Sequence, residues 1–307
     1  MLALVNTPSA PIPVEFHDVA EPEPAIDEAI VEVRAFSLNR GELALLSGRP
    51  EGWRPGQDIA GVIVQAAADG SGPNEGTRVV ALVESAGWAQ RVAASTARMA
   101  ALPDNVSFAN AATLPIAGLT ALRIVRHGGS LLGKRVLITG AAGGVGRFAV
   151  QLATLAGAEV TGVVGRPERA TGLSERGAAA VVSNIQEAEG LFDLILESAG
   201  GPSLAGAISK VAPGGTIVVF GNSSREDTPI SFSSFAGHAE ARLLPFFIYH
   251  SGTPASMGVD LATLVSLVAA GKLIPEIGLE DSWRNVYRAT TALRDRNVNG
   301  KAVFHVD

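Results

Sequence analysis

The stretch that decides the fold is residues 134–157, KRVLITGAAGGVGRFAVQLATLAG. It opens with the apolar run 136–138, which is too short for a stable helix and rich in residue types that favour a buried strand. Glycine dominates residues 140–146, and from Arg147 the apolar spacing becomes helical until Gly157. A strand, a glycine turn and a helix form the arrangement that lays a pyrophosphate against the free N–H groups of a helix N-terminus.

The glycines match the dinucleotide-binding fingerprint G-x-G-x-x-G, with Ala141 at its first position. Gly143 would let the backbone approach the phosphates, because a Cβ would stand in the way. Gly146 would let the helix pack closely on its strand, and Gly140 and Gly144 add freedom to the turn. A glycine cluster alone is weak evidence, so the interpretation depends on the sequence around it.

Strand-like runs and helix-length segments alternate after this motif. A helix is expected from Pro167 to Gly177. Alternating strands and helices indicate βαβ units and a parallel sheet. The strand-like runs are residues 159–164, 179–182, 191–196, 216–220 and 243–249.

Length and composition bound the class of protein. With 307 residues, 47% of them hydrophobic and 18% charged, the chain suits one large or two ordinary globular domains. A net charge of −6 without any basic run argues against a nucleic-acid binder, and the lack of cysteine excludes thiolate chemistry. No export signal or membrane-spanning run is visible, so we expect a cytoplasmic protein without a membrane partner.

The first hundred residues show a different pattern from the middle of the chain. Apolar and polar residues alternate in short runs separated by turn clusters, which suggests an antiparallel, partly barrel-like β domain. The tail from residue 272 holds short strands around one helix and is too short to fold alone. We therefore expect it to return to the N-terminal domain.

A set of short motifs, in order over nearly the full length, carries a resemblance to a known family. The motifs are Ser37-Leu38-Asn39-Arg40, Ser47-Gly48, Gly56-Gln57-Asp58-Ile59-Ala60-Gly61-Val62, Gly76-Thr77-Arg78-Val79, Leu102-Pro103-Asp104, residues 114–121, the glycine motif and Gly300-Lys301-Ala302-Val303. With them the chain resembles the medium-chain dehydrogenase/reductase superfamily, in its zinc-independent, quinone oxidoreductase-like branch.

The resemblance implies an α/β fold in which a Rossmann domain with a doubly wound parallel sheet is inserted in a GroES-like, mostly antiparallel β domain. The expected boundaries are 1–116 for the GroES-like domain, 117–271 for the NADPH-binding Rossmann domain and 272–307 for the return. The active site would lie in the cleft between the two domains.

A metal site is not expected. The five histidines are scattered without zinc-ligand spacing, and zinc-dependent relatives carry Gly-His-Glu where this chain has Gly56-Gln57-Asp58. Without a Lewis acid, hydride addition to an activated acceptor is the more natural chemistry.

The second strand ends without the acidic residue that usually binds the ribose of NAD. Arg166 and Arg169 lie there instead, and arginine forks bind phosphate well. In related quinone oxidoreductases a basic residue at the Arg169 position contacts the 2′-phosphate, so NADPH is the expected cofactor. The alternative is that both arginines only form a solvated helix start.

The resemblance places Asn39 and Thr120 near the nicotinamide. Residues after the fourth and fifth strands face the cofactor or serve only as turns, and Phe246 and Phe247 wall the nicotinamide or fill core. No catalytic residue is identified. The expected cofactor-binding residues are Asn39, Thr120, Gly140, Ala141, Ala142, Gly143, Gly144, Val145, Gly146, Gly165, Arg166, Arg169, Asn184, Ser198, Ala199, Gly221, Asn222, Phe246 and Phe247.

These features predict an NADPH-dependent, zinc-independent reductase that transfers a hydride to a small-molecule quinone or α,β-unsaturated carbonyl. One alternative is an enoyl reductase acting on a polyketide or fatty-acyl substrate. A rival from another class is an NADPH-binding structural or redox-sensor protein without turnover. A homodimer is expected from the family, through sheet extension near residues 243–248.

Some relatives carry a tyrosine in the loop after Asn39, where this chain has Leu43-Ala44-Leu45. Neither tyrosine of the chain matches that position, so water is the expected proton source. The physiological acceptor does not follow from the sequence, because substrate pockets in such folds are built from variable loops.

Overall fold

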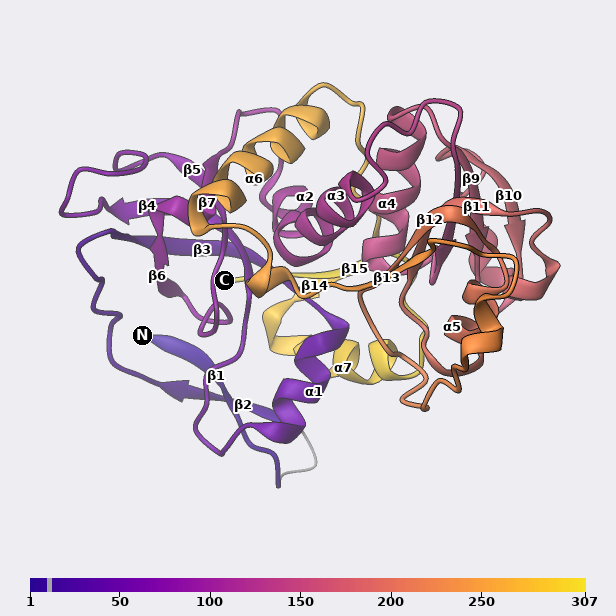
Figure 1. Cartoon of the computed structure of the whole chain (residues 1–307). Coiled ribbons are helices and arrows are strands. Elements are labelled where there is room, and N and C mark those ends of the chain that lie inside the picture. Colours follow the sequence, from indigo (N-terminus) through magenta and orange to yellow (C-terminus); the bar gives the residue numbers. More distant parts are fainter. Residues whose placement is uncertain (10–12) are drawn as a thin grey trace. The chain divides into compact units, whose positions relative to one another are not determined.

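The computed structural model describes residues 1–9 and 13–307, which divide into two compact units (Figure 1). The first unit comprises Met1–Leu119 and Gly252–Asp307, and the second comprises Thr120–Ser251. The Rossmann domain was expected to extend to residue 271, but the second unit ends at Ser251 and α6 (Pro254–Ala269) belongs to the first unit. Packing explains the difference, because α6 lies against β7 (Met99–Ala101) and η1 (Thr96–Arg98).

The second unit is built on a six-stranded sheet in which every pair of neighbours is parallel. This confirms the doubly wound sheet expected from the sequence. The strand order is β10-β9-β8-β11-β12-β13, so the order reverses between β8 and β11, where sheets of this kind bind dinucleotides. The strands are β8 (Arg135–Thr139), β9 (Glu159–Val163), β10 (Ala178–Val182), β11 (Phe192–Glu197), β12 (Val211–Val219) and β13 (Arg242–Pro245).

Helices cover this sheet. Most apolar residues of α4 (Gly144–Leu155) are buried, and this helix packs on β8 and β9, while α5 (Gly201–Ile208) packs on β11 and β12. The helix expected over 167–177 is wrong: only η3 (Pro167–Ala170) forms, because Thr171 has a non-helical ψ of 128° and Gly172 a positive φ. The other helices of the unit are α3 (Leu119–Arg126), η4 (Ile185–Glu187), η5 (Phe232–Phe235) and η6 (Ile248–His250).

The sixth apolar run also differs from its expected extent. It forms a strand only to Pro245, because Phe247 is the N-cap of the 3₁₀ turn η6 and its carbonyl accepts the N–H of His250 at 3.0 Å. Tyr249 therefore lies in a turn and does not end a strand.

The first unit holds a seven-stranded sheet in which neighbouring strands are antiparallel, except for β14 and β15. Its tail strand β15 pairs with β3, with Ala302 opposite Leu38. Phe36 stacks on Trp88 in its core. The strands of the unit are β1 (Leu2–Asn6), β2 (Val14–Asp18), β3 (Glu28–Leu38), β4 (Asp58–Gln65), β5 (Arg78–Leu82), β6 (Arg91–Ser95), β7, β14 (Ile277–Ser282) and β15 (Lys301–His305).

The segment after Asn39 was expected as a loop and is instead α1 (Arg40–Gly48). Asn39 is its N-cap, and Glu42 at the third helical position completes a capping box. Across the described parts of the chain, no helix combines the length and the apolar character that crossing a membrane requires. The other helices of the unit are α2 (Phe108–Ala112), the π-helix η2 (Leu114–Gly118), η7 (Trp283–Asn285) and α7 (Val286–Arg294).

Candidate functional site

The glycine turn after β8 is shaped by contacts that only glycine permits. Gly140 has a φ of +64°, and its carbonyl accepts the N–H of Gly143 at 2.9 Å. A Cβ on Gly146 would lie 2.3 Å from the Gly140 oxygen. Gly143 is the N-cap of α4, so no side chain caps the first N–H groups of this helix. The turn therefore fits a dinucleotide pyrophosphate at the positive end of α4.

Small residues bring the loops after β8, β11 and β12 side by side. A Cβ on Gly140 would lie 2.7 Å from Ser198 Oγ, and a Cβ on Gly221 would lie 3.1 Å from the Ser198 carbonyl oxygen. The Ser198 hydroxyl donates to the carbonyl of Thr139 at 3.2 Å. The residues expected to follow the first, fourth and fifth strands are thus in mutual contact at the carboxyl edge of the sheet.

A buried carboxylate that sequence reasoning missed orders the loop after β11. Glu197 accepts hydrogen bonds from the backbone N–H groups of Ala199 and Gly200, both at 3.0 Å. It also accepts from the hydroxyls of Ser203 at 2.9 Å and Thr139 at 3.2 Å. The available clue was an acidic residue three positions before Gly200, the N-cap of α5, because a negative charge is favourable near a helix N-terminus.

The two expected phosphate-binding arginines lie on the segment after β9. Gly165 and Arg166 are exposed, whereas Arg169 is half-buried and its Nη2 lies 3.5 Å from the carbonyl oxygen of Ala142. This contact brings Arg169 beside the glycine turn. A 2′-phosphate bound next to that turn would be within reach of an arginine fork.

Two of the expected asparagines use their side chains in local turns. Asn184 caps η4 by accepting the N–H of Gln186 at 2.9 Å. Asn222 accepts the N–H of Arg225 at 3.1 Å. Both follow strand ends, so their backbones lie at the same edge of the sheet as the glycine turn, while their side-chain oxygens serve as turn acceptors.

The remaining expected residues of the second unit have different surroundings. Phe246 is buried, with its ring edge-on to His127 at a centroid separation of 6.1 Å. Phe247 is 67% exposed. Thr120 is buried at the start of α3 and does not follow a strand of the sheet.

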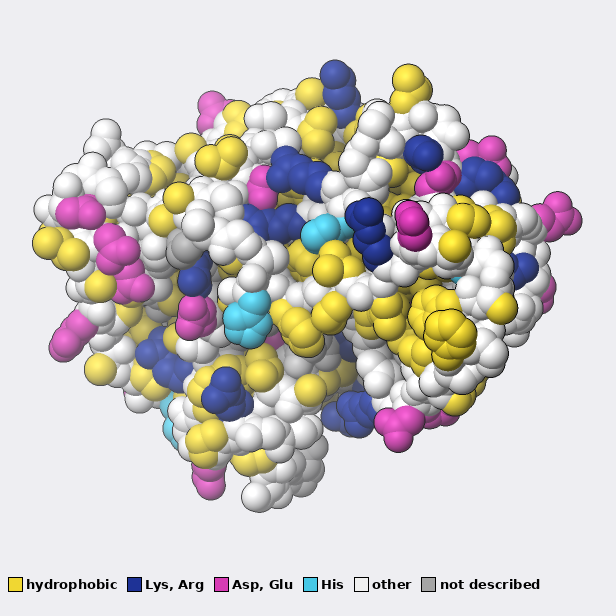
Figure 2. Space-filling model, viewed as in Figure 1, with side chains coloured by type: hydrophobic (Ala, Val, Ile, Leu, Met, Phe, Trp, Pro, Cys, Tyr) yellow, Lys and Arg dark blue, Asp and Glu magenta, His cyan; other side chains and the backbone are white. Residues whose placement is uncertain are grey.

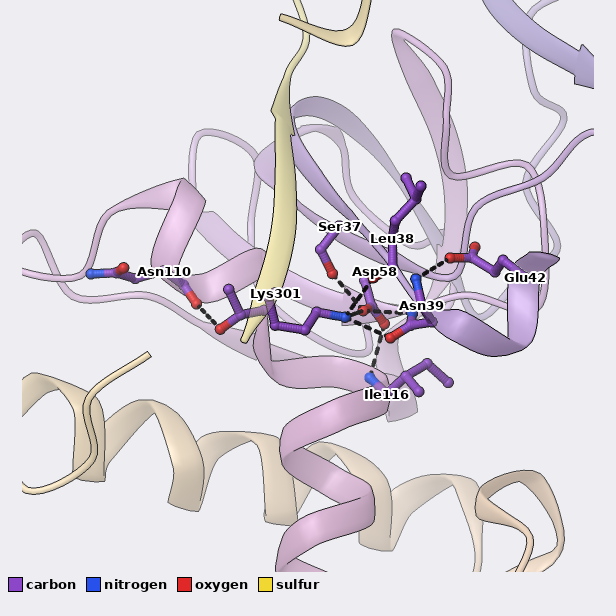
Figure 3. A network of polar contacts seen from close by, with 9 residues as sticks. Ser37, Leu38, Asn39, Glu42, Asp58, Asn110, Ile116 and Lys301 are labelled. Carbon is purple, nitrogen blue, oxygen red and sulfur yellow. Dashed lines mark hydrogen bonds and ion pairs between the residues drawn. The ribbon is translucent and has the colours of Figure 1, made fainter. Parts of the chain in front are cut away.

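Asn39 belongs to the first unit and lies in a buried polar network (Figure 3). Its side-chain Nδ2 donates to Asp58 Oδ2 at 2.8 Å, and its Oδ1 accepts from Lys301 Nζ at 2.5 Å. Ser37 Oγ also donates to Asp58 Oδ2, at 2.6 Å, and the N–H of Ile116 donates to Asp58 Oδ1 at 2.8 Å. The network fixes the orientation of the Asn39 amide.

Glu42 is a second buried acid in this region. Its Oε2 accepts the N–H of Asn39 at 2.8 Å, while its Oε1 has no hydrogen-bond partner within residues 1–9 and 13–307. Burial raises the pKa of the Glu42 carboxyl to about 8, and the nearby charge of Asp58 adds to this. A pKa of about 8 favours the protonated, neutral form of Glu42 at pH 7. It was missed because a glutamate in the sequence gives no local sign of burial.

Within the same described residues, no three His, Cys, Asp or Glu side chains are grouped so that they could hold a metal ion. The position at which zinc-dependent relatives carry Gly-His-Glu offers a poor donor set. Both oxygens of Asp58 accept protein hydrogen bonds, and the Lys301 ammonium group lies 3.1 Å from Oδ2. A zinc ion there would meet a buried positive charge, so these residues do not fit zinc.

Comparison with known families gives two matches. Residues 25–123 match the family described as "Alcohol dehydrogenase GroES-like domain", and residues 144–264 match "Zinc-binding dehydrogenase". The first unit thus contains the expected GroES-like domain.

The individual relatives include quinone oxidoreductases and a polyketide synthase protein. The chain is 30% identical to a quinone oxidoreductase of Pongo abelii over 222 residues, which cover 67% of this chain and 68% of that protein. It is 27% identical to a quinone oxidoreductase of Pseudomonas aeruginosa over 95% of both chains. It is 34% identical to the spectinabilin polyketide synthase system protein NorB of Streptomyces orinoci over 80% of this chain, but spans only 12% of that protein.

A solved structure shares the fold. The Escherichia coli quinone oxidoreductase complexed with NADPH superimposes with a TM-score of 0.88, at 22% identity, over 99% of this chain and 100% of that chain.

Proposed function

Because the chain belongs to the quinone oxidoreductase-like branch of the medium-chain dehydrogenase/reductase superfamily, we propose that it is an NADPH-dependent reductase of quinones or α,β-unsaturated carbonyls. The observation that carries the proposal is the glycine turn at the N-terminus of α4, with Arg169 beside it. The relatives named quinone oxidoreductase support the choice of acceptor.

The residues of the second unit fit NADPH. The glycine turn would hold the pyrophosphate, since a Cβ at Gly146 would collide with the turn and α4 presents its N-terminal N–H groups there. Arg166 and Arg169 would bind the 2′-phosphate. The loop 198–200, ordered by Glu197, would line the cofactor along the same edge of the sheet. When bound, NADPH supplies the hydride, and the protein supplies orientation and electrostatics.

The acceptor class follows from what the chain's own residues can stabilise. A lone carbonyl that is reduced to an alkoxide needs strong stabilisation of that charge, which a metal ion usually gives. The residues around Asp58 do not fit zinc. Quinones and enones spread the incoming charge over a conjugated system, so we favour them as substrates.

An enoyl reductase acting on a polyketide or fatty-acyl thioester is the second candidate. The match to the polyketide synthase protein NorB favours it, at 34% identity over 257 residues. Both candidates reduce a conjugated acceptor. They differ in that the acyl thioester carries its conjugated alkene on a long carrier, so the choice of acceptor distinguishes them.

We also propose a homodimer formed through β13. This strand is the last in the sheet order, and Leu243 on it is 40% exposed. Figure 2 shows hydrophobic side chains at the surface around β13. An exposed apolar edge strand is a template for pairing with a second copy. Light scattering should show a dimer that Leu243→Lys converts to monomers, whereas Val259→Lys, at an exposed position of α6, should leave the dimer intact.

Cofactor binding is the direct test of this proposal. Titration followed by nicotinamide fluorescence should show tighter binding of NADPH than of NADH. Arg169→Ala should weaken NADPH binding about ten- to a hundred-fold, because a hydrogen bond to a charged group contributes roughly 1.5–3 kcal/mol. NADH binding should hardly change. Equal affinity of the unmodified protein for both cofactors would contradict the proposed cofactor.

A rival from another class is an NADPH-binding protein without turnover. It would bind NADPH with the same glycines and arginines, so binding alone does not distinguish it. Turnover with a quinone does.

A further inference from the structure

Arg147 is a buried cation near the N-terminus of α4, directly after the glycine motif. Only 5% of the residue is exposed. Its Nε donates to the carbonyl oxygen of Ala142 at 3.3 Å, within the glycine turn. Its Nη2 donates to the carbonyl oxygen of Thr171 at 2.9 Å, just beyond η3. One guanidinium group thus joins the two loops that the sequence assigned to the pyrophosphate and to the 2′-phosphate.

The carbonyl of Ala142 is shared by two arginines. Nη2 of Arg169 lies 3.5 Å from the same oxygen. Two guanidinium groups near one carbonyl repel each other, and both lie close to the positive end of the α4 dipole. Such a concentration of positive charge is favourable when an anion binds beside it.

The segment that carries Arg166 and Arg169 has little structure of its own. η3 is a single 3₁₀ turn of four residues, and its first residues are exposed. The Thr171 hydroxyl closes the turn by donating to the Glu168 carbonyl at 3.2 Å. An isolated turn of this length is marginal in water, so its position depends on contacts with the rest of the unit.

We propose that Arg147 is a positioning residue for cofactor selectivity: it ties residues 166–171 to the glycine turn, so that Arg166 and Arg169 are held where a 2′-phosphate binds. This inference rests on the proposed NADPH-dependent function. Arg147 acts through the other two arginines, because its own guanidinium group is buried against the carbonyls of Ala142 and Thr171.

The test compares three variants. Arg147→Met keeps the length of the side chain and removes its donors and its charge. Arg147→Lys keeps the charge, but its single ammonium group lacks the fork that reaches both carbonyls. Arg126→Met is the matched control, because it removes an exposed arginine at the end of α3 in the same unit.

Dissociation constants for NADPH, NADH, 2′,5′-ADP and AMP are measured by calorimetry, together with the melting temperature of each cofactor-free variant. Arg147→Met should weaken NADPH and 2′,5′-ADP binding about tenfold, equivalent to roughly 1.4 kcal/mol. It should change NADH and AMP binding less than about twofold. The affinities of Arg147→Lys for NADPH and 2′,5′-ADP should fall between those of Arg147→Met and of the unmodified protein. The affinities of Arg126→Met should match those of the unmodified protein.

Equal weakening of all four ligands would overturn the inference, since Arg147 would then only support the glycine turn. Unchanged selectivity in Arg147→Met would also overturn it. If Arg147→Met does not fold, the preference of Arg147→Lys for NADPH over NADH is judged by the same two outcomes. Failure of the proposed function is distinguishable: it shows as equal NADPH and NADH binding in the unmodified protein, before any variant is compared.

Discussion

Lys301 Nζ lies 3.1 Å from Asp58 Oδ2, and the two side chains are 3% and 0% exposed. The pair joins β15, near the end of the chain, to β4, and the amide of Asn39 lies between them with both of its polar atoms used. A buried ion pair is costly to desolvate, and we expect this one to fix one arrangement of the region.

Removing one member of this pair should destabilise the protein strongly. Lys301→Met leaves the Asp58 carboxylate buried without its cation, and we expect a loss of about 3–5 kcal/mol in the free energy of unfolding. Lys134→Met breaks the more exposed Lys134–Asp193 pair and should cost less than about 1 kcal/mol. Urea unfolding measures both, and similar small losses for the two variants would contradict a structural role for Lys301.

The raised pKa of Glu42 predicts how stability depends on pH. The carboxyl has an ordinary pKa of 4.5 in the unfolded chain and a pKa of about 8 in the folded protein. The folded state therefore binds the proton more tightly. The contribution of this proton to the free energy of unfolding is complete below pH 4.5 and is lost as the pH rises to about 8.

Glu42→Gln keeps the shape of the side chain and stays neutral at every pH, so the variant should not lose stability between pH 4.5 and 8 through this residue. The variant and the unmodified protein should be about equally stable near pH 5, and the variant should be more stable by up to a few kcal/mol near pH 9. Denaturation curves across this range check the result. A parallel pH dependence of the two proteins would show that Glu42 titrates normally.

The close contact at Gly146 predicts a steric effect on cofactor binding. Gly146→Ala places a Cβ 2.3 Å from the Gly140 carbonyl oxygen, so the glycine turn must shift. We expect NADPH binding to weaken at least tenfold and stability to fall by about 1–3 kcal/mol. Gly48→Ala, in α1 with nothing within 4 Å of the added carbon, should leave both unchanged or raise stability slightly. Normal binding by Gly146→Ala would contradict the role assigned to the turn.

The proton source can be tested with the two tyrosines of the chain. Tyr287 lies on α7, where its hydroxyl accepts from Arg288 Nε at 3.3 Å, and Tyr249 lies in η6. If solvent protonates the reduced product, Tyr249→Phe and Tyr287→Phe should each change turnover on a quinone and on an enone less than tenfold. A positioned acid typically contributes about 10²–10⁴-fold. A thousand-fold loss for Tyr249→Phe on the enone alone would identify it as the donor.

The sequence predicts the parts of this fold that depend on local pattern. The strands and the glycine turn of the second unit follow from apolar periodicity and glycine placement. The sequence does not predict contacts between distant residues, such as that of Lys301 with Asp58 over 243 positions. Charged side chains are usually solvated, so Arg147 and Glu42 gave no local sign of burial. Their roles appear only when tertiary packing places them.

If the protein is a reductase, the bound nicotinamide is used in turnover. The most direct measurement is the loss of NADPH absorbance when the purified protein is mixed with a small quinone, an enone panel and an enoyl thioester in separate reactions. We predict steady oxidation of NADPH with the quinone or an enone, faster than with NADH, and slowed by Arg169→Ala when NADPH is limiting. Tight NADPH binding without oxidation by any of these acceptors would contradict reductase activity and support a binding protein without turnover.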